Sequence, residues 1–368
     1  MRSIHSNCIV KRGNQVLFPG SSKKPKIFCR KALTNPVFID GVARVGKNII
    51  ALVASSFERA EHIQGQPMID SLFLLHGMGL IDSDAALDLL RKEVNNYLML
   101  GQLGRHINTN LYDYTGVWNS RMPDVYLKRL LRRDTPETYL QLRAAMRRDT
   151  PILLLHSHEI LCDCDLFLKG FQDSRIVSVF RHPVDVVFSW QRKGFGERYG
   201  KDLRAGAHTV WGVKGPVPWW AFDWAEEYEN LQPIERVIKS VAVLNARCYD
   251  RLDRMPTKHR NRLLPLCFEH FVRDPEPMVA ALADFLGTRP TSVKAVGTVS
   301  SSDATMGTST EQVLRKQRLP RKLDRVEFKR RFQLTRENSS RTTFEVFVED
   351  CLRYEKRFRP GISIRRLL

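Results

Sequence analysis

A glycine-containing turn between an apolar strand and a helix constrains this chain more than any other segment. Residues 36–39 (Pro-Val-Phe-Ile) predict a buried strand, and the apolar pattern from Ile49 onward predicts a helix. Between them lies the segment Gly41-Val-Ala-Arg-Val-Gly-Lys-Asn48. Such a turn points backbone N–H groups and a helix N-terminus at an anion, so it predicts a phosphate site at the end of a strand.

A second phosphate-binding segment is predicted about 140 residues further along the chain. The apolar run of residues 175–180 predicts another buried strand, followed by Arg181-His-Pro-Val-Asp-Val-Val-Phe-Ser189. Pro183 fixes the bend from strand to helix, while Arg181 and Ser189 offer a cation and a hydroxyl to phosphate oxygens. Two such segments in one chain predict a nucleotide that carries phosphate at both ends.

The pair of segments resembles the sulfotransferase superfamily, whose donor is 3′-phosphoadenosine 5′-phosphosulfate. The resemblance covers roughly residues 34–290. The family's first loop reads Gly-x-x-(Arg/Lys)-x-Gly-(Thr/Ser)-x; Arg44 and Gly46 match it, whereas Lys47 replaces the hydroxyl. The resemblance implies that Arg44, Gly46, Lys47, Asn48 and backbone amides bind the 5′-phosphosulfate. Arg44 and Lys47 would also stabilise the charge that develops on the leaving oxygen.

The second segment matches the family's Arg-x-Pro-x-Asp-x-x-x-Ser pattern, which implies that Arg181 and Ser189 bind the 3′-phosphate. Residues 264–287 are similar to the strand and helix that follow the nucleotide site in the family. A late basic loop closes over the nucleotide in sulfotransferases. Arg315 and Lys316 stand in the right order for that role, although the usual Arg-Lys-Gly signature is absent.

Sulfonate transfer also needs a base that takes the proton of the acceptor. His158 is predicted to be this base, because it follows the apolar residues 152–155 and matches the family's spacing between the catalytic His and the 3′-phosphate Arg. Two alternatives stay open: His156 shares a strand face with His158, and Glu159 can orient either ring or act as the base, as in glycan-sulfating relatives. Both histidines can also have a purely structural role at the strand end.

The order of strand and helix patterns predicts a single α/β domain over residues 34–368. We expect a P-loop-like, mostly parallel sheet flanked by helices, with the nucleotide at the carboxyl ends of the strands. Residues 84–150 contain three helical patterns and are predicted to form a helical cap insertion. Residues 290–368 are predicted to close the domain, and residues 1–33 to form a basic appendage.

The acceptor is less constrained by the sequence. Five of the six Trp residues lie between Trp190 and Trp224, directly after the second phosphate segment. Flat aromatic faces suit sugar rings and other apolar groups, so the expected acceptor is a carbohydrate, a glycolipid or a small molecule with a hydroxyl or amine. Packing of these rings inside a helical cap is an open alternative.

The formal net charge of +19 is concentrated at the two ends of the chain. Residues 1–34 hold eight Lys/Arg and no Asp/Glu, and residues 315–366 hold seventeen Lys/Arg against seven Asp/Glu. Such a field attracts a multiply charged nucleotide. No zinc-finger, RNP-type or basic heptad pattern accompanies the charge, so nucleic-acid binding is not indicated.

Cysteine spacing and hydropathy give the expected compartment. The seven cysteines show no paired metal-ligand spacing, and no apolar run approaches the ~20 residues that a membrane span needs. We expect a soluble cytoplasmic protein with reduced thiols and no metal. The basic, acid-free N-terminus also fits an organellar targeting segment, which stays an alternative.

Two other functions fit parts of the pattern. Gly41 to Lys47 also fits the phosphate loop of a kinase that uses ATP, but such an enzyme would need a hydroxyl at position 48 and a carboxylate that holds magnesium. A non-catalytic basic module that binds acidic polymers is the second alternative. A sulfotransferase dependent on 3′-phosphoadenosine 5′-phosphosulfate accounts for both phosphate segments.

Overall fold

The computed structural model describes residues 32–65, 67–202, 205–291, 309–316 and 323–368. All but the last two residues of the predicted basic appendage, residues 1–33, therefore lie outside the described residues. In the described part of the chain, no helix combines the length and the hydropathy that crossing a bilayer requires.

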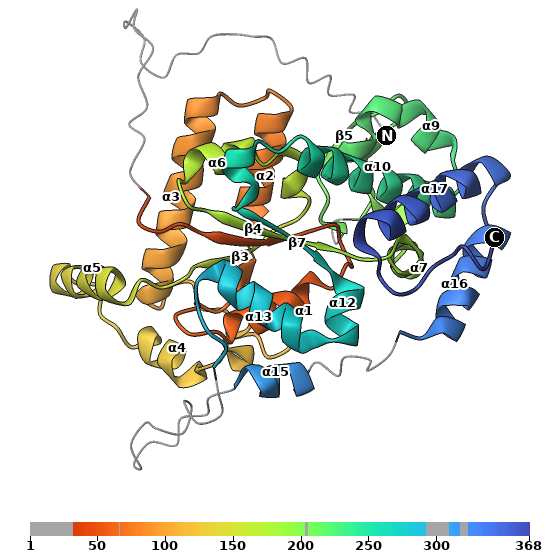
Figure 1. The fold of residues 1–368 in the computed structure, drawn as a ribbon. Coiled ribbons are helices and arrows are strands. Elements are labelled where there is room, and N and C mark those ends of the chain that lie inside the picture. The colour runs from red at the N-terminus through yellow and green to blue at the C-terminus, as the bar shows by residue number, and fades with distance from the viewer. Residues whose placement is uncertain (1–31, 66, 203–204, 292–308, 317–322) are drawn as a thin grey trace, which may run out of the picture.

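Five parallel strands form the central sheet in the order β2–β3–β1–β4–β7 (Figure 1). Their bounds are Val37–Asp40 (β1), Gln64–Gly65 (β2), Leu154–His156 (β3), Arg175–Phe180 (β4) and Leu263–Cys267 (β7). In β1, Ile39 is level with His156 of β3 on one side and with Val177 of β4 on the other. The segments that follow β1, β3 and β4 therefore meet at one edge of the sheet. Strands β3 and β4 lie on opposite sides of β1, and ligands of parallel sheets bind at such a change of side.

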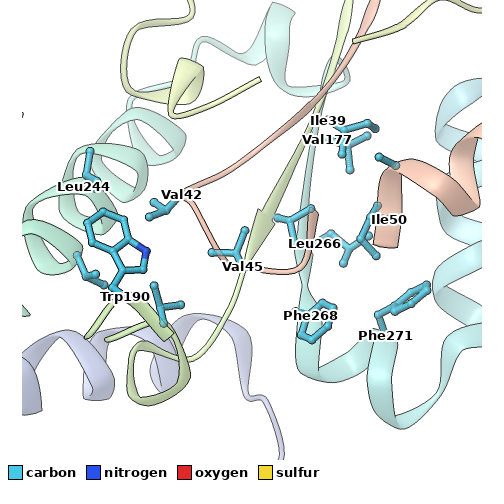
Figure 2. Packing of buried hydrophobic residues seen from close by; sticks show 14 of the residues in the cluster. Ile39, Val42, Val45, Ile50, Val177, Trp190, Leu244, Leu266, Phe268 and Phe271 are labelled. Atoms are coloured by element: carbon cyan, nitrogen blue, oxygen red, sulfur yellow. The ribbon is translucent and has the colours of Figure 1, made fainter. Parts of the chain in front are cut away.

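Helices cover both faces of the sheet, which confirms the predicted α/β class. Alternate β1 side chains enter different clusters: Val37 and Ile39 pack on one face, and Phe38 packs on the other. The first face is covered by α1 (Lys47–Ser55), α12 (Phe268–Arg273) and α13 (Pro275–Leu286), and Figure 2 shows this packing around Ile50 and Leu266. The second face is covered by α2 (Pro67–Gly77), α3 (Ser83–Gln102) and α6 (Asp165–Gly170).

The remaining elements surround this core. They are η1 (Val117–Asn119), α4 (Pro123–Leu130), α5 (Pro136–Asp149), η2 (Ile160–Asp163), α7 (Pro183–Arg192), α8 (Phe195–Arg198), β5 (Thr209–Trp211), β6 (Pro216–Pro218), η4 (Trp219–Trp224), α9 (Ala225–Asn230), α10 (Pro233–Asp253), α11 (Thr257–Arg260), α15 (Thr310–Lys316), α16 (Arg325–Glu337) and α17 (Arg341–Phe358). The C-terminal helix α17 packs against α7 and α10.

The three helical patterns of residues 84–150 occur as α3, α4 and α5. Two of the three starts have a side-chain cap: the Asp82 carboxylate accepts from the N–H groups of Asp84 and Ala85, and the Thr135 hydroxyl accepts from the N–H of Thr138. Helix α4 begins instead at Pro123. Helix α3 packs against α2 and α6 on the sheet. It is therefore part of the core.

Candidate functional site

The loop between β1 and α1 is held in one conformation by its glycines and valines. Gly41 and Gly46 have φ of 144° and 96°, and a Cβ on either would clash, with the Val179 carbonyl and the Phe268 ring respectively. Val42 and Val45 are buried in the first cluster, near Trp190 and Leu266 (Figure 2). The apolar side chains thus anchor the loop in the core, and its backbone amides take no part in this packing.

The backbone amides of residues 44–48 lie where the sequence predicts an anion cradle. Among the described residues, none accepts a hydrogen bond from these five consecutive N–H groups, and α1 begins without a side-chain cap or an acidic residue. Arg44 has φ of 72°, in the left-handed region that a non-glycine residue seldom adopts. Unpaired N–H groups at a helix N-terminus favour an anion such as a phosphate or a sulfonate.

Lys47 lies across the loop. Its Nζ donates to the carbonyl of Gly41 at 2.6 Å and to that of Ser157 at 2.7 Å. Burial lowers the pKa of Lys47, while the nearby Glu159 and Asp40 carboxylates act in the opposite direction. An ammonium has three N–H donors, so one remains for a ligand in the cradle.

The second predicted segment adjoins the first. Arg44 Nε donates to Ser189 Oγ at 3.1 Å, and the Arg181 guanidinium donates to the Arg44 carbonyl at 3.4 Å and to Asp185 at 3.1 Å. Arg181 also lies over the ring of Phe268, with 5.0 Å between guanidinium carbon and ring centroid. Arg44, Arg181 and Ser189 therefore form one cluster at the ends of β1 and β4.

A third arginine joins this cluster from the C-terminal region. Arg331, on α16, donates to the Asp185 carboxylate at 2.5 Å, and its guanidinium lies 4.8 Å from the Phe188 ring centroid. Arg330 lies over the same ring at 5.4 Å. Sequence reasoning missed Arg331, because nothing local distinguishes it from the many other C-terminal cations.

Arg315 and Lys316, which were predicted to close over the nucleotide, belong to α15 and not to the cluster of Arg44, Arg181 and Ser189. Arg315 pairs with Glu311 on α15. This helix begins beside the C-terminal end of α1, where Ser56 Oγ donates to Thr310 Oγ1 at 2.9 Å, whereas the anion cradle is at the other end of α1. Lys316 is the last residue of α15, and its side chain lies outside the described part. The structure thus brings Arg331, and not Arg315, to Arg181 and Ser189.

The two histidines at the end of β3 lie side by side. Their ring centroids are 4.8 Å apart, and both rings line the same cavity, as the strand alternation of His156 and His158 predicts. His156 is buried, which lowers its pKa, and its Nε2 has no partner among the described residues. The side chain of His158 is 41% exposed and is the more accessible of the two.

Asp70 orients the accessible histidine. His158 Nδ1 lies 3.1 Å from Asp70 Oδ2, and the His158 backbone N–H donates to Asp70 Oδ1 at 3.2 Å. Burial raises the pKa of Asp70 to about 7, whereas the cavity environment and the Lys47 ammonium lower the pKa of His158 to about 4. Asp70 was missed because it lies 88 residues before His158. Its one signal is a carboxylate inside the apolar pattern of residues 67–77.

Glu159 contacts the loop. Its Oε1 accepts from the Ala43 N–H at 3.2 Å, and its backbone has φ of 55°. Burial raises the pKa of Glu159. The carboxylate lines the same cavity as His158, so the structure brings together Arg44, Lys47, His158 and Glu159, the four residues predicted to take part in the chemistry.

These groups open into a cavity of about 1250 Å³. The cavity is lined by Ala43, Arg44, Lys47 and Asn48 of the loop, by the Asp113–Thr115 segment of the predicted cap and by the aromatic segment after α7. Some of the aromatic residues pack in the core and others line the cavity, so both of the roles expected from the sequence occur. Trp190 is buried in the core, whereas Trp219 and Phe222 line the cavity.

Thiols and metal ligands were also considered in the described residues. The cysteines in this part of the chain are free thiols, including Cys162 and Cys248, whose sulfur atoms lie 3.6 Å apart. No group of three or more His, Cys, Asp or Glu side chains in the same part is placed to hold a metal ion.

Comparison with known proteins gives structural matches only. No family model and no curated protein matches the chain. The solved structures that the chain resembles include several sulfotransferases. One from Mycobacterium avium is 12% identical, with a TM-score of 0.38, and the match covers 89% of this chain and 78% of that one.

Two further structures have a TM-score of 0.34. A sulfotransferase from Alicyclobacillus acidocaldarius is 14% identical over 88% of this chain and 96% of its own. A sulfotransferase domain from the curacin biosynthetic pathway is 13% identical over 83% and 98%. TM-scores of this size carry no argument about activity, which rests here on the geometry of the site.

Gly46 gives a test of the loop conformation. We expect Gly46→Ala to lower the free energy of unfolding by about 1–3 kcal/mol, because the added Cβ meets the Phe268 ring at a φ that favours glycine. Urea unfolding measures the change. Gly215→Ala is the control, since a Cβ there meets open space. Equal stability of the two variants would contradict the packing described for the loop.

Proposed function

We propose that the protein transfers a sulfonate group from 3′-phosphoadenosine 5′-phosphosulfate to a hydroxyl of an acceptor. The observation that carries this proposal is the hydrogen bond between Arg44 and Ser189, which joins two anion-binding segments beside a His–Asp pair. Two adjacent segments of this kind suit a nucleotide that carries phosphate at both ends.

Each end of the donor has its own set of groups. The N–H groups of residues 44–48 and the Lys47 ammonium would hold the 5′-phosphosulfate. Arg181 and Ser189 would hold the 3′-phosphate, with Arg331 as the late cation. The two sets lie at the ends of β1 and β4, which are paired neighbours in the sheet.

The chemistry needs one proton transfer and one displacement at sulfur. The acceptor oxygen forms a bond to sulfur, and the bond from sulfur to the bridging phosphate oxygen breaks with its electron pair left on that oxygen. The acceptor proton passes to His158 Nε2, which is free when Nδ1–H donates to Asp70. The products are a sulfate ester and adenosine 3′,5′-bisphosphate, whose new charge Lys47 and Arg44 stabilise.

Nucleotide binding separates this proposal from a kinase. Asn48 stands where a kinase loop carries its hydroxyl, and the Asp40 carboxylate at the end of β1 is already bonded to the N–H groups of Ile160 and Leu161. We expect calorimetry to show that adenosine 3′,5′-bisphosphate binds without metal and more tightly than ATP with magnesium. Equal or tighter binding of the magnesium complex would favour the kinase.

Ionisation of Asp70 predicts a pH dependence. Below about pH 7 the protonated Asp70 donates to His158 Nδ1, so the ring proton sits on Nε2 and the base is blocked. Above it, the carboxylate accepts from Nδ1–H and Nε2 is free. The charged groups near Asp70 include Lys47, which favours its ionisation, Glu159, whose negative charge opposes it, and His208 when that ring is protonated. Turnover should therefore rise with pH through about 7.

Nitrogen chemical shifts of the His158 ring measure the same change without an acceptor. The proton should move from Nε2 to Nδ1 as the pH passes about 7. Asp70→Asn should abolish this step. A His158 tautomer that stays constant across neutral pH in the unmodified protein would be incompatible with the assigned Asp70–His158 pair.

A further inference from the structure

The cavity is larger than the reacting groups need. Its volume of about 1250 Å³ exceeds the roughly 300–1000 Å³ of pockets that hold drug-sized ligands. Lys47, Asp70 and His158 account for a small part of the lining. The loop residues Ala43, Arg44 and Asn48 would face the donor, and the rest of the lining is left for the molecule that carries the acceptor hydroxyl.

One wall of the cavity is a stripe along α2. Asp70, Phe73, Leu74, Gly77 and Met78 all line it, and their spacing of three and four residues places them on one helix face. The stripe starts with the carboxylate that holds His158 and continues with apolar side chains only. Eight residues of helix span about 12 Å. The apolar surface therefore extends about one nanometre away from the base.

A second wall of the cavity is largely aromatic. Phe195, Val210, Trp219 and Phe222 line the cavity, and Phe222 is 59% exposed. Ser71 of α2 and His208 are joined by a hydrogen bond of 3.0 Å between Oγ and Nε2, so the aromatic segment is tied to the α2 wall. Rings left this exposed inside a cavity suit an apolar occupant.

Several polar side chains on the lining are already bonded to other protein groups, whereas His156 Nε2 and Trp220 Nε1 have no partner among the described residues. His208 is bonded to Ser71, Asp223 pairs with Arg247 at 3.1 Å, and Asp113 accepts from Thr115 and Asn108. A carbohydrate would need partners for hydroxyls all around its ring, because each buried unpaired hydroxyl is costly. An apolar chain needs none.

From these walls we infer that the acceptor is an amphiphile: one hydroxyl at His158, attached to an extended apolar body that lies between α2 and the aromatic segment. The inference deepens the proposed sulfonate transfer and rests on it for the role of the hydroxyl. Of the acceptors expected from the sequence, it favours a lipid-like molecule over a free carbohydrate.

Binding of straight-chain alcohols tests the inference. With adenosine 3′,5′-bisphosphate saturating, 1-hexanol, 1-octanol and 1-decanol are titrated while tryptophan emission is recorded, since Trp219 and Trp220 line the cavity. Affinity should rise about fourfold for each added methylene, which is the effect of removing one methylene from water. Affinity independent of chain length, or tighter binding of maltose than of 1-decanol, would overturn the inference.

Two neighbouring leucines provide a matched pair of variants. Leu74→Asp places a charge in the α2 wall and should weaken 1-decanol binding at least tenfold, whereas Leu75→Asp should not, because Leu75 is exposed and does not line the cavity. Phe222→Ala, at an exposed ring, is a second test that spares the fold. If neither Leu74→Asp nor Phe222→Ala weakens binding, the alcohol lies elsewhere and the inference fails.

The binding of adenosine 3′,5′-bisphosphate is measured separately from that of the alcohols, so that the proposed donor and the proposed acceptor are tested independently. Loss of adenosine 3′,5′-bisphosphate binding with intact chain-length dependence would reject the proposed donor but keep an apolar pocket. Intact nucleotide binding without chain-length dependence would reject the amphiphile and keep the donor.

Discussion

Replacing His158 by alanine is expected to lower turnover roughly 10²–10⁴-fold, the range for loss of a positioned base. The ring is the accessible member of the histidine pair, and Asp70 fixes its Nδ1. The affinity for adenosine 3′,5′-bisphosphate should not change, because no loop amide or arginine of the phosphate cluster bonds to this ring in the described residues.

The comparison variants are His156→Ala and Glu159→Gln. His156→Ala should have the smaller effect on turnover and act through stability, since that ring is buried against Tyr114. Turnover can be followed with 1-decanol or a phenol as the acceptor. If His158→Ala retains full activity while Glu159→Gln is inactive, the base is the carboxylate and Asp70 has another role.

Replacing Arg181 by alanine is expected to cost roughly 2–3 kcal/mol of nucleotide affinity, or about 30- to 150-fold in Kd. The guanidinium is held by Asp185 and by the Arg44 carbonyl, so it is positioned before the ligand arrives. The loss should be confined to nucleotides with a 3′-phosphate. Calorimetry with adenosine 3′,5′-bisphosphate and with adenosine 5′-phosphate separates the contribution of the 3′-phosphate from that of the rest of the nucleotide.

Arg315→Ala is the matched control for Arg181→Ala. Both remove an arginine paired with an acidic residue four positions away, but Arg315 lies on α15, away from the cradle. Its removal should leave the affinity unchanged. An Arg181→Ala protein that still prefers the 3′-phosphorylated nucleotide by the original margin would show that the 3′-phosphate binds elsewhere.

The groups of the site that are local in sequence could be predicted from it. Gly46 and Arg181 follow strands whose apolar runs are unmistakable, and the parallel sheet then brings the ends of β1 and β4 together. Strand alternation also predicted that His156 and His158 share a face, and both rings line the same cavity. In each case the physical cause lies within a few residues of the side chain concerned.

The missed residues depend on contacts between distant segments. Asp70 reaches His158 because α2 packs beside η2, and Arg331 reaches Asp185 because α16 packs on α7. Neither contact leaves a periodic signal. Arg315 and Arg331 have similar basic surroundings in the sequence, so only the path of the chain after α13 decides which one meets the phosphate cluster.

The hydrogen bond from Arg44 to Ser189 makes the two halves of the proposed nucleotide site share a residue. Arg44 supplies an amide to the first cradle and its guanidinium to the hydroxyl of the second. Substitutions at Arg44 and Ser189 therefore cannot act independently, and their free-energy effects on nucleotide binding are not additive. The contributions of these two residues to nucleotide affinity are therefore obtained from a double-mutant cycle and not from either single substitution.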